Sequence, residues 1–169
     1  MKKIILNVAI TLDGFIEGPN GEYDWCFADQ DYGMEEFLKS IDSIFYGRRS
    51  YEVLLQSGNN PFAAKRQYVF SNTLPAADGA IVINKDILGA VEMLKQQPGK
   101  NIWLFGGAQL THYFLEMGLV DELLLAVHPL LLGSGKTLFN ERTNRIPLEL
   151  LSSKTYDTGL VQSRYLVKK

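Results

Sequence analysis

Short apolar runs alternate with segments of helical periodicity through the first two thirds of the chain, and this alternation limits the fold more than any other feature. Five runs have the length and composition of buried strands. Four of them are residues 4–10, 43–46, 80–83 and 101–105, and the fifth begins at residue 65 or 67 and ends at residue 70. Apolar residues recur every three or four positions in four further segments, at 32–41, 50–55, 88–96 and 109–117. Strands that alternate with helices favour parallel pairing, with the helices packed on the faces of the sheet.

The last third of the chain has a different pattern. Residues 122–127, 148–156 and 160–167 are strand-like and have no helical segment between them, which is typical of antiparallel strands added to a parallel sheet. No repeat, linker or low-complexity tract interrupts the 169 residues, a length that suits one domain. We therefore expect one α/β domain over residues 1–169, with a mostly parallel central sheet flanked by helices and an antiparallel C-terminal strand addition.

Charge and composition exclude several classes of partner. The formal net charge of −2 leaves no excess of Lys and Arg to neutralise a nucleic acid backbone. The sole cysteine, Cys26, excludes an intramolecular disulfide, and two distant histidines argue against a zinc cluster, so no metal is expected. The apolar run 4–10 is short and interrupted by Asn7, and no apolar stretch approaches ~20 residues. We expect a cytoplasmic protein that binds no membrane.

The sequence Gly47-Arg48-Arg49-Ser50 stands where a predicted strand ends and a helix begins. A helix N-terminus presents free N–H groups and a partial positive charge, which together favour a phosphate. Two arginines and a hydroxyl add charge-assisted donors for the same anion. The alternative is a solvated turn in which Ser50 caps the helix.

Two more strand ends carry small or polar residues. Gly106-Gly107 follows the strand 101–105 and precedes a helix, although a tight turn would also explain the two glycines. Ser71-Asn72 ends another strand. In an open α/β sheet, ligands bind outside the carboxyl ends of the strands. The convergence of three such ends predicts an anion-binding site more strongly than any one motif.

Longer matching stretches connect these motifs to a known family. They are residues 7–16 (NVAITLDGFI), 24–25 (DW), 47–52 (GRRSYE), 105–110 (FGGAQL), 118–123 (GLVDEL) and 128–139 (HPLLLGSGKTLF). In this order and spacing the chain resembles the dihydrofolate reductase superfamily, in the branch similar to the C-terminal reductase domain of bifunctional riboflavin-biosynthesis deaminase/reductase proteins. The resemblance covers nearly all 169 residues.

The resemblance implies that NADPH binds in an extended groove along the strand ends. The residues implied to flank the nicotinamide are Ala9 and Ile16. Those implied to hold the pyrophosphate and ribose-phosphate region are Gly47, Arg48, Arg49 and Ser50. The adenosine phosphate would lie near Ser71 and Asn72. The residues implied to wrap the pyrophosphate are Gly106, Gly107, Ala108, Gln109 and Leu110.

Two departures from the family pattern bear on function. Ala108 stands where many relatives have a third glycine, and its methyl group is tolerable if the backbone there needs no positive φ. Phe105 stands where riboflavin-type reductases often carry an acidic residue, which puts their phosphorylated ribosyl-pyrimidine substrate in doubt. The resemblance implies NADPH-dependent reduction of a small pterin- or pyrimidine-like heterocycle. The alternatives are a non-catalytic NADP(H)-binding protein and a riboflavin-pathway ribosylamino-pyrimidine reductase.

Three carboxylates are candidates for the catalytic acid. Asp29 and Asp31 bracket the place where folate reductases carry a carboxylate after a tryptophan like Trp25, and either could bind substrate or relay a proton. Both could instead cap the following helix. Asp13 begins the glycine-punctuated segment 13–24, a predicted loop over the cofactor, and could equally be a turn residue.

The apolar residues of the C-terminal half predict a homodimer. Residues 119–120, 123–127 and 130–132 form a dense apolar series, and 123–127 does not alternate, so both faces of that strand should be covered. A two-fold partner is a common way to cover the second face. The C-terminal strands and the loop 133–147 of the same chain are the alternative cover.

The side chains of His128, Trp103 and Cys26 are predicted to be structural.

Overall fold

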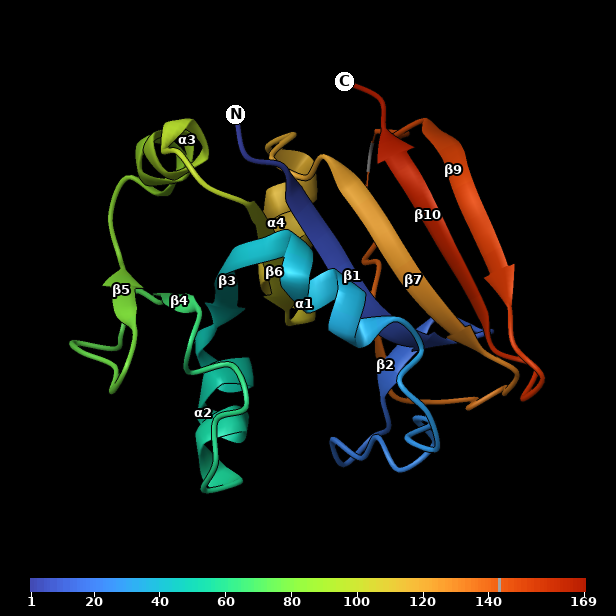
Figure 1. Cartoon of the computed structure of the whole chain (residues 1–169). Coiled ribbons are helices and arrows are strands. Elements are labelled where there is room, and N and C mark those ends of the chain that lie inside the picture. The colour runs from blue at the N-terminus through green and yellow to red at the C-terminus, as the bar shows by residue number, and fades with distance from the viewer. Residues whose placement is uncertain (143) are drawn as a thin grey trace.

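One mixed sheet crosses the molecule in the computed structural model, which describes residues 1–142 and 144–169. Within those residues its eight strands have the order β5-β4-β3-β6-β1-β7-β10-β9 (Figure 1). The bounds of these strands are β1 Ile4–Thr11, β3 Ile41–Gly47, β4 Arg66–Phe70, β5 Ile81–Ile83, β6 Asn101–Gly106, β7 Glu122–His128, β9 Leu148–Thr155 and β10 Val161–Val167. The helices are α1 Met34–Ser40, α2 Arg48–Gln56, α3 Ile87–Gln96 and α4 Ala108–Glu116.

Strand pairing confirms the predicted mixed sheet. β1 lies between β6 and β7 and is parallel to both, and β3 is parallel to β4 and β6. β10 is antiparallel to β7 and to β9, so the C-terminal strands extend the parallel part at one edge. The parallel strands of this chain therefore direct their carboxyl ends to the same edge of the sheet, which is where ligands bind in such folds.

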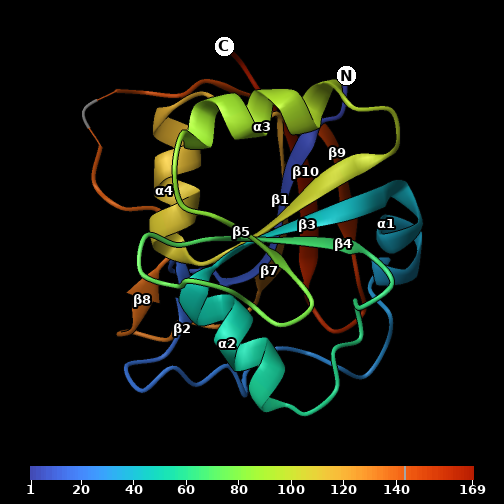
Figure 2. The same ribbon diagram turned by 90° about the vertical axis from the view of Figure 1, so that its left-hand side faces the viewer.

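Helices cover both faces of the sheet (Figure 2). Phe37 of α1 and Tyr51 of α2 are buried in a core on one face, with Trp103 of β6. Val91 of α3 and Phe114 of α4 are buried in the core on the opposite face. Trp103 is 4% exposed and its indole N–H donates to the backbone oxygen of Asn7 at 3.0 Å, so the predicted core role of this residue is confirmed.

Two local features differ from the predictions. The segment 13–24 contains a short strand, β2 (Phe15–Glu17), which pairs with β8 (Lys136–Thr137). Strands of two or three residues are too short to show a periodicity in the sequence. The two that pair here are also more than a hundred residues apart along the chain. The helix predicted from residue 32 begins at Met34, because Tyr32 and Gly33 have φ values of 50° and 80°, outside the range of a right-handed helix.

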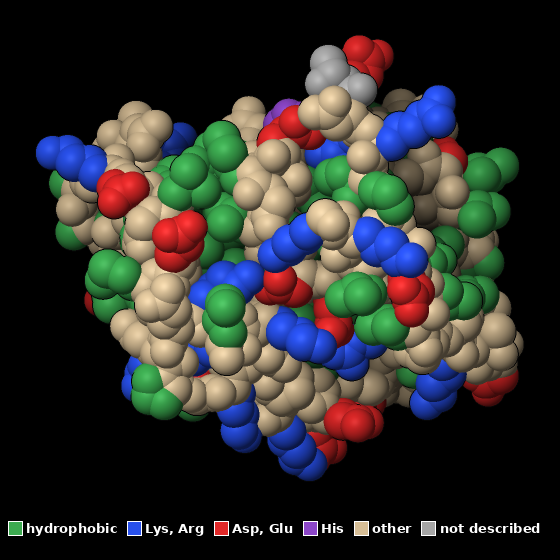
Figure 3. Space-filling model, turned by 90° about the horizontal axis from the view of Figure 1, so that it is seen from above, with side chains coloured by type: hydrophobic (Ala, Val, Ile, Leu, Met, Phe, Trp, Pro, Cys, Tyr) green, Lys and Arg blue, Asp and Glu red, His purple; other side chains and the backbone are tan. Residues whose placement is uncertain are grey.

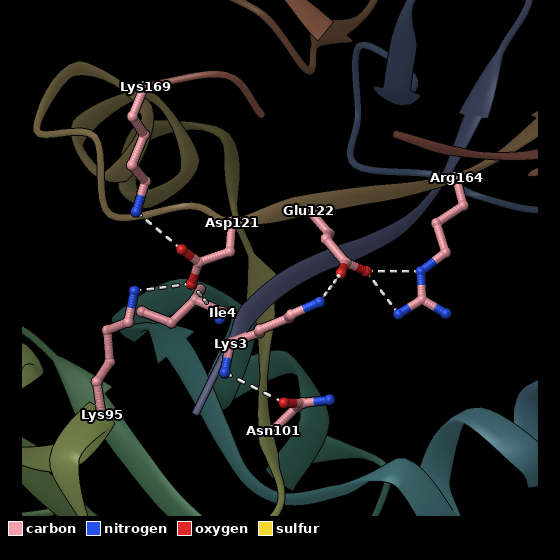
Figure 4. A network of polar contacts seen from close by, with 8 residues as sticks. All are labelled: Lys3, Ile4, Lys95, Asn101, Asp121, Glu122, Arg164 and Lys169. Atoms are coloured by element: carbon pink, nitrogen blue, oxygen red, sulfur yellow. Dashed lines mark hydrogen bonds and ion pairs between the residues drawn. The ribbon is translucent and has the colours of Figure 1, made fainter. Parts of the chain in front are cut away.

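Two adjacent acidic residues, one just before β7 and one at its first position, connect several elements through polar contacts (Figure 4). Asp121 accepts hydrogen bonds from Lys95, Lys169 and the backbone N–H of Ile4, at 2.7–2.8 Å. Burial raises the pKa of Asp121, but the hydrogen bonds from Lys169 and Lys95 outweigh it and hold the pKa below its ordinary value. Asp121 therefore stays ionised and joins the N-terminal strand to α3 and the C-terminus.

The second acidic residue, Glu122, is more deeply buried. Its side chain is 2% exposed, and its oxygens accept from Lys3 at 2.7 Å and from Arg164 at 2.5 and 2.6 Å. Lys3 precedes β1 and Arg164 lies on β10, the strands that flank β7. Glu122 thus links the three strands at the junction of parallel and antiparallel pairing.

The apolar strand that motivated the homodimer is covered within one chain. Leu123 and Leu125 of β7 are buried in one core and Leu124 packs against the other. Among the exposed apolar residues, Leu130 and Leu131 of the same series are 36% and 71% exposed, and a group of three lies on β9, where Leu148, Leu150 and Leu151 are 43%, 57% and 47% exposed. Figure 3 views the molecule from above, and hydrophobic side chains line the edge on the side of β9. The structural argument for a partner therefore concerns β9 and not β7.

No helix in the described part of the chain has the length and apolar character needed to cross a membrane.

Candidate active site

The starts of α2 and α4 lie against each other at the carboxyl ends of β3 and β6. A Cβ atom at Gly47 would lie 3.5 Å from both the oxygen of Gly106 and the nitrogen of Gly107. A Cβ atom at Gly107 would lie 3.3 Å from the Ser50 hydroxyl. The residues predicted from two distant motifs are therefore brought together, and glycine allows the two backbones to approach this closely.

The N-termini of these two helices have no side-chain cap among the residues that the structure describes. By contrast, Asp86 caps α3 through the N–H of Gly89, and Asp31 accepts from the N–H of Glu35 in α1. Free N–H groups and the aligned helix dipoles favour an anion at the start of a helix. Two such starts side by side form a site suited to a pyrophosphate.

Each of the three residues after Phe105 has a distinct backbone requirement. Gly106 has a φ of +110°, which favours glycine, and its peptide bond to Gly107 is cis. Gly107 has a φ of −77°, so glycine is needed there for space and not for conformation. Ala108 starts α4 and is not among the described residues with positive φ, which confirms that its methyl group is tolerated. Of the other residues predicted to wrap the pyrophosphate, Gln109 is exposed and Leu110 half-buried.

Charged and polar groups extend the site from α2 toward β4. Arg48 donates to the Thr73 hydroxyl at 2.9 Å, and the Ser71 hydroxyl accepts from the N–H groups of Thr73 and Leu74. Arg49 is exposed, and no ion pair joins it to another residue in 1–142 or 144–169. Arg48 is thus connected to Ser71 through Thr73, whereas the guanidinium of Arg49 lies near Gly21, 3.7 Å from where a Cβ atom of that glycine would be.

A shallow depression of about 380 Å³ lies beside α1 and is lined in part by the candidate residue Asp31, whereas one of about 360 Å³ includes a residue of the predicted cofactor surface. The latter lies at the ends of β4 and β5 and includes Asn72, Asn84 and Lys85. Asn72 was predicted as a site residue and Lys85 was not. The sequence signal for Lys85 resembles that of the other residues, a polar group two positions after the end of a short strand.

The sheet surface is partly exposed near the proposed nicotinamide position, where two small side chains lie, and we call this small-residue surface the opening. Ala9 of β1 is paired in register with Ala126 of β7, and both are half-buried. Because side chains alternate along a strand, Asn7 lies on the same face as Ala9, one step deeper in the sheet. Phe105 is the penultimate residue of the neighbouring strand β6, where it packs against Tyr46 and Trp103 with ring centroids 5.0 Å away. Ile16 of β2 packs at the edge of the core on the opposite face.

The three candidate carboxylates are exposed and already have protein donors. Asp13 accepts from the Thr11 hydroxyl at 2.6 Å, which is the main reason its pKa is lowered, and from the N–H groups of Leu132 and Gly133. Asp29 accepts from the Tyr32 hydroxyl at 2.6 Å. Asp31 accepts a hydrogen bond from the backbone N–H of Glu35 in α1, which agrees with its alternative role at the start of that helix. The structure does not bring the three together, and their catalytic role stays a prediction.

A histidine and two aromatic residues pack beside the opening. The His128 ring lies 5.2 Å from that of Trp25 and 4.9 Å from that of Phe27. Its Nε2 accepts from the backbone N–H of Phe27, and its Nδ1 donates to the oxygen of Ala126. His128 is 3% exposed, and this burial lowers its pKa, so the ring is neutral and structural, as predicted. Burial likewise raises the pKa of the half-buried Cys26 thiol to about 11, which disfavours a reactive thiolate.

His128 predicts how stability changes with pH. The folded protein binds a proton at His128 less readily than the unfolded chain, whose ordinary pKa is 6.5. The stabilisation is therefore complete above pH 6.5 and is lost as the pH falls toward the folded pKa. We expect the urea midpoint of unfolding to fall between pH 7.5 and 5.5, and to fall less in His128→Phe. An equal fall in both proteins would show that other groups are responsible.

Comparison with known proteins places the chain in a family. The model of the RibD C-terminal domain matches residues 2–162. The Bacillus subtilis (strain 168) protein YyaP is 45% identical to this chain, and the match covers 97% of this chain and 94% of YyaP. YwjB of the same strain is 34% identical, and the match covers 98% of both chains.

Solved structures share the fold. A Shewanella protein described as a "putative riboflavin biosynthesis protein" has a TM-score of 0.88 at 25% identity, with both chains fully covered. The deaminase/reductase of Thermotoga maritima has a TM-score of 0.75 at 13% identity, and the match covers 99% of this chain and 57% of that one. From its match to the family model and to these relatives, the chain belongs to the RibD C-terminal domain family.

Proposed function

We propose that this protein is an NADPH-dependent reductase of a small pyrimidine- or pterin-like heterocycle. The observation that carries the proposal is the pair of uncapped helix starts, at Gly47 and Gly107, which lie against each other at the ends of β3 and β6. Family names support the reaction class: the Thermotoga structure is that of a diaminohydroxyphosphoribosylaminopyrimidine deaminase/5-amino-6-(5-phosphoribosylamino)uracil reductase, and a Corynebacterium diphtheriae neighbour is called a pyrimidine reductase-like protein.

The residues of the strand-end surface fit a dinucleotide with an extra phosphate. The pyrophosphate would take the N–H groups at the starts of α2 and α4, and Ser50 would add a hydroxyl. Arg48 and Arg49 offer charge-assisted donors along the surface. The depression at Asn72 and Lys85 would take the adenosine end. When bound, NADPH supplies a hydride from its nicotinamide ring.

The protein itself orients the two reactants and limits the access of water. Ala9 and Ala126 leave room for flat rings above the sheet, and Trp25 and Phe27 form an apolar wall held by His128. Asp31 remains our proposal for the carboxylate that assists proton transfer. Its contact with the start of α1 would hold it in place beside the segment that follows Trp25.

The first test of the proposal compares two cofactors. The protein should bind NADPH more tightly than NADH, because charge-assisted hydrogen bonds to the extra phosphate contribute about 1.5–3 kcal/mol, or roughly 10- to 150-fold. Isothermal titration calorimetry with both cofactors measures this difference. Lys85→Met should weaken the binding of NADPH more than that of NADH. The control is Lys136→Met, whose lysine pairs with Glu17, and it should alter the affinity for neither cofactor. Equal affinities for the two cofactors would contradict the phosphate assignment.

A non-catalytic NADP(H)-binding protein is the second candidate, and one observation favours it. All three candidate carboxylates are exposed and already have protein donors. NADPH oxidation measured with dihydrofolate, other reduced pterins and ribosylamino-pyrimidines separates the two candidates. Oxidation with any of these substrates establishes the reductase, whereas tight NADPH binding without turnover favours the binding protein.

We also propose that the protein is a homodimer paired through β9. This strand forms one edge of the sheet, and each of its eight residues is exposed in the single chain. Exposed strand edges with apolar residues are prone to association, which a defined partner prevents. Light scattering at micromolar concentration should give the mass of two chains, and Leu150→Lys should give the mass of one. A monomeric wild-type protein would contradict this proposal.

A further inference from the structure

Asn7 is a polar residue in the middle of the central strand, and the proposed cofactor contacts do not explain it. It is 8% exposed, between Leu6 and Val8, whose side chains belong to the core on the other face of the sheet. On its own face it is paired in register with Leu124 of β7. The backbone oxygen of Asn7 accepts from the indole of Trp103. Its carboxamide has no hydrogen-bond partner among the residues that the structure describes, and its polar atoms are not among the fully buried unpaired ones, so they keep some contact with solvent.

A carboxamide is an unusual group at this position. Most polar side chains that are this deeply buried have a hydrogen-bond partner in the protein. A leucine would match the apolar residues that pack on the same face of the sheet. The strand therefore holds a polar group that meets solvent and has no protein partner among the described residues, so this group can pair with a ligand.

The surroundings of Asn7 indicate where that ligand would lie. Ala9 and Ala126 form the small-residue opening one step toward the strand ends, and Asn7 lies at its inner limit. Phe105, with Trp103 and Tyr46 packed on it, flanks the same region on β6. A flat heterocycle that enters the opening beside the proposed nicotinamide position would meet one polar side chain, that of Asn7, on an otherwise apolar floor.

We propose that Asn7 is the residue that recognises the substrate, by pairing with a lactam edge of an uncharged heterocycle. This inference rests on the proposed reductase function. A carboxamide offers one donor and one acceptor, which match the adjacent C=O and N–H of a lactam. A carboxylate would offer two acceptors and would favour a protonated amidine-like edge instead. The structure places no carboxylate of Asp13, Asp29 or Asp31 at this position, since all three are exposed.

The inference is tested with NADPH-saturated protein and two matched probes. Pteridine-2,4-dione presents a neutral lactam edge, and 2,4-diaminopyrimidine presents an amidine edge that accepts a proton. Wild-type protein should bind the dione, and Asn7→Leu should weaken it at least tenfold. Asn7→Asp should also weaken the dione but gain affinity for 2,4-diaminopyrimidine, and that affinity should rise as the pH falls. Asn59→Leu, at an exposed position far along the chain, is the control.

A stability measurement separates recognition from a structural role. If Asn7 binds a ligand, Asn7→Leu replaces a polar group that has no partner in the free protein, which should then melt at the same or a higher temperature. A clear fall in melting temperature would assign Asn7 to the fold and overturn the inference. Unchanged affinity for the dione in Asn7→Leu would overturn it as well. Calorimetry with NADPH alone is independent of both results, so failure to bind NADPH would instead contradict the proposed function.

Discussion

Replacing Gly107 with valine should abolish NADPH binding while the protein stays folded. The φ of −77° at this position is open to any residue, so the backbone of the folded chain tolerates the change. The first carbon of the new side chain would lie 3.3 Å from the Ser50 hydroxyl, and its two methyl groups would cover the N–H groups at the start of α4. We expect at least a 100-fold loss of affinity by calorimetry, because several hydrogen bonds to one anion are blocked together.

Gly107→Ala provides the graded comparison. Its side chain is a single carbon that fills only the beginning of the same space. We therefore expect an NADPH affinity between that of the wild type and that of Gly107→Val. Circular dichroism and thermal melting of each variant establish that the fold is retained. Normal NADPH binding by a folded Gly107→Val protein would reduce Gly107 to a turn residue and remove the main support for the proposed cofactor.

Replacing Glu122 with glutamine should cost about 3 kcal/mol of the free energy of unfolding, because it breaks a buried ion pair. The carboxylate holds Lys3 and Arg164 at 2.5–2.7 Å, and its side chain is 2% exposed. We place the loss at the lower end of the range for buried pairs, because both cations are partly exposed and recover hydration. The shift in melting temperature should be about 2–4 °C for each kcal/mol in a chain of this size.

Glu35→Gln is the matched control. Glu35 pairs with Lys39 at 2.6 Å, and the two side chains are 74% and 72% exposed. Exposed pairs contribute about 0–1 kcal/mol, so this variant should unfold almost as the wild type does in urea. Comparable losses in the two variants would show that burial at Glu122 adds nothing, and that the junction of the three strands depends on other contacts.

Elements with enough residues to show a period could be predicted from the sequence. The strand predicted at 101–105 is observed as Asn101–Gly106, and the helix predicted at 88–96 as Ile87–Gln96. Parallel pairing followed from the alternation of strands and helices. The meeting of Gly47 with Gly107 also followed, because parallel strands place their carboxyl ends at one edge.

Features that depend on distant partners could not be predicted. β2 and β8 have three and two residues, which is too few to show alternation, and each is defined only by the other. The contact of Asp13 with the N–H groups of Leu132 and Gly133 depends on the same long-range approach. The apolar residues at 123–127 suggested an uncovered face, and sequence alone did not reveal that helices and loops of the same chain cover it.

The position of β1 at the centre of the sheet also determines when this chain can fold during synthesis. β1 leaves the ribosome before the other strands of this sheet, and its two partners lie at residues 101–106 and 122–128. Chains grow at about 5–20 residues per second, so β1 waits several seconds for both neighbours. Its hydrogen-bonding edges stay open to other chains during that time, and contacts this distant in sequence also close slowly. A nascent chain of this protein is thus most exposed to misassociation before β7 has been made, when a chaperone would have most effect.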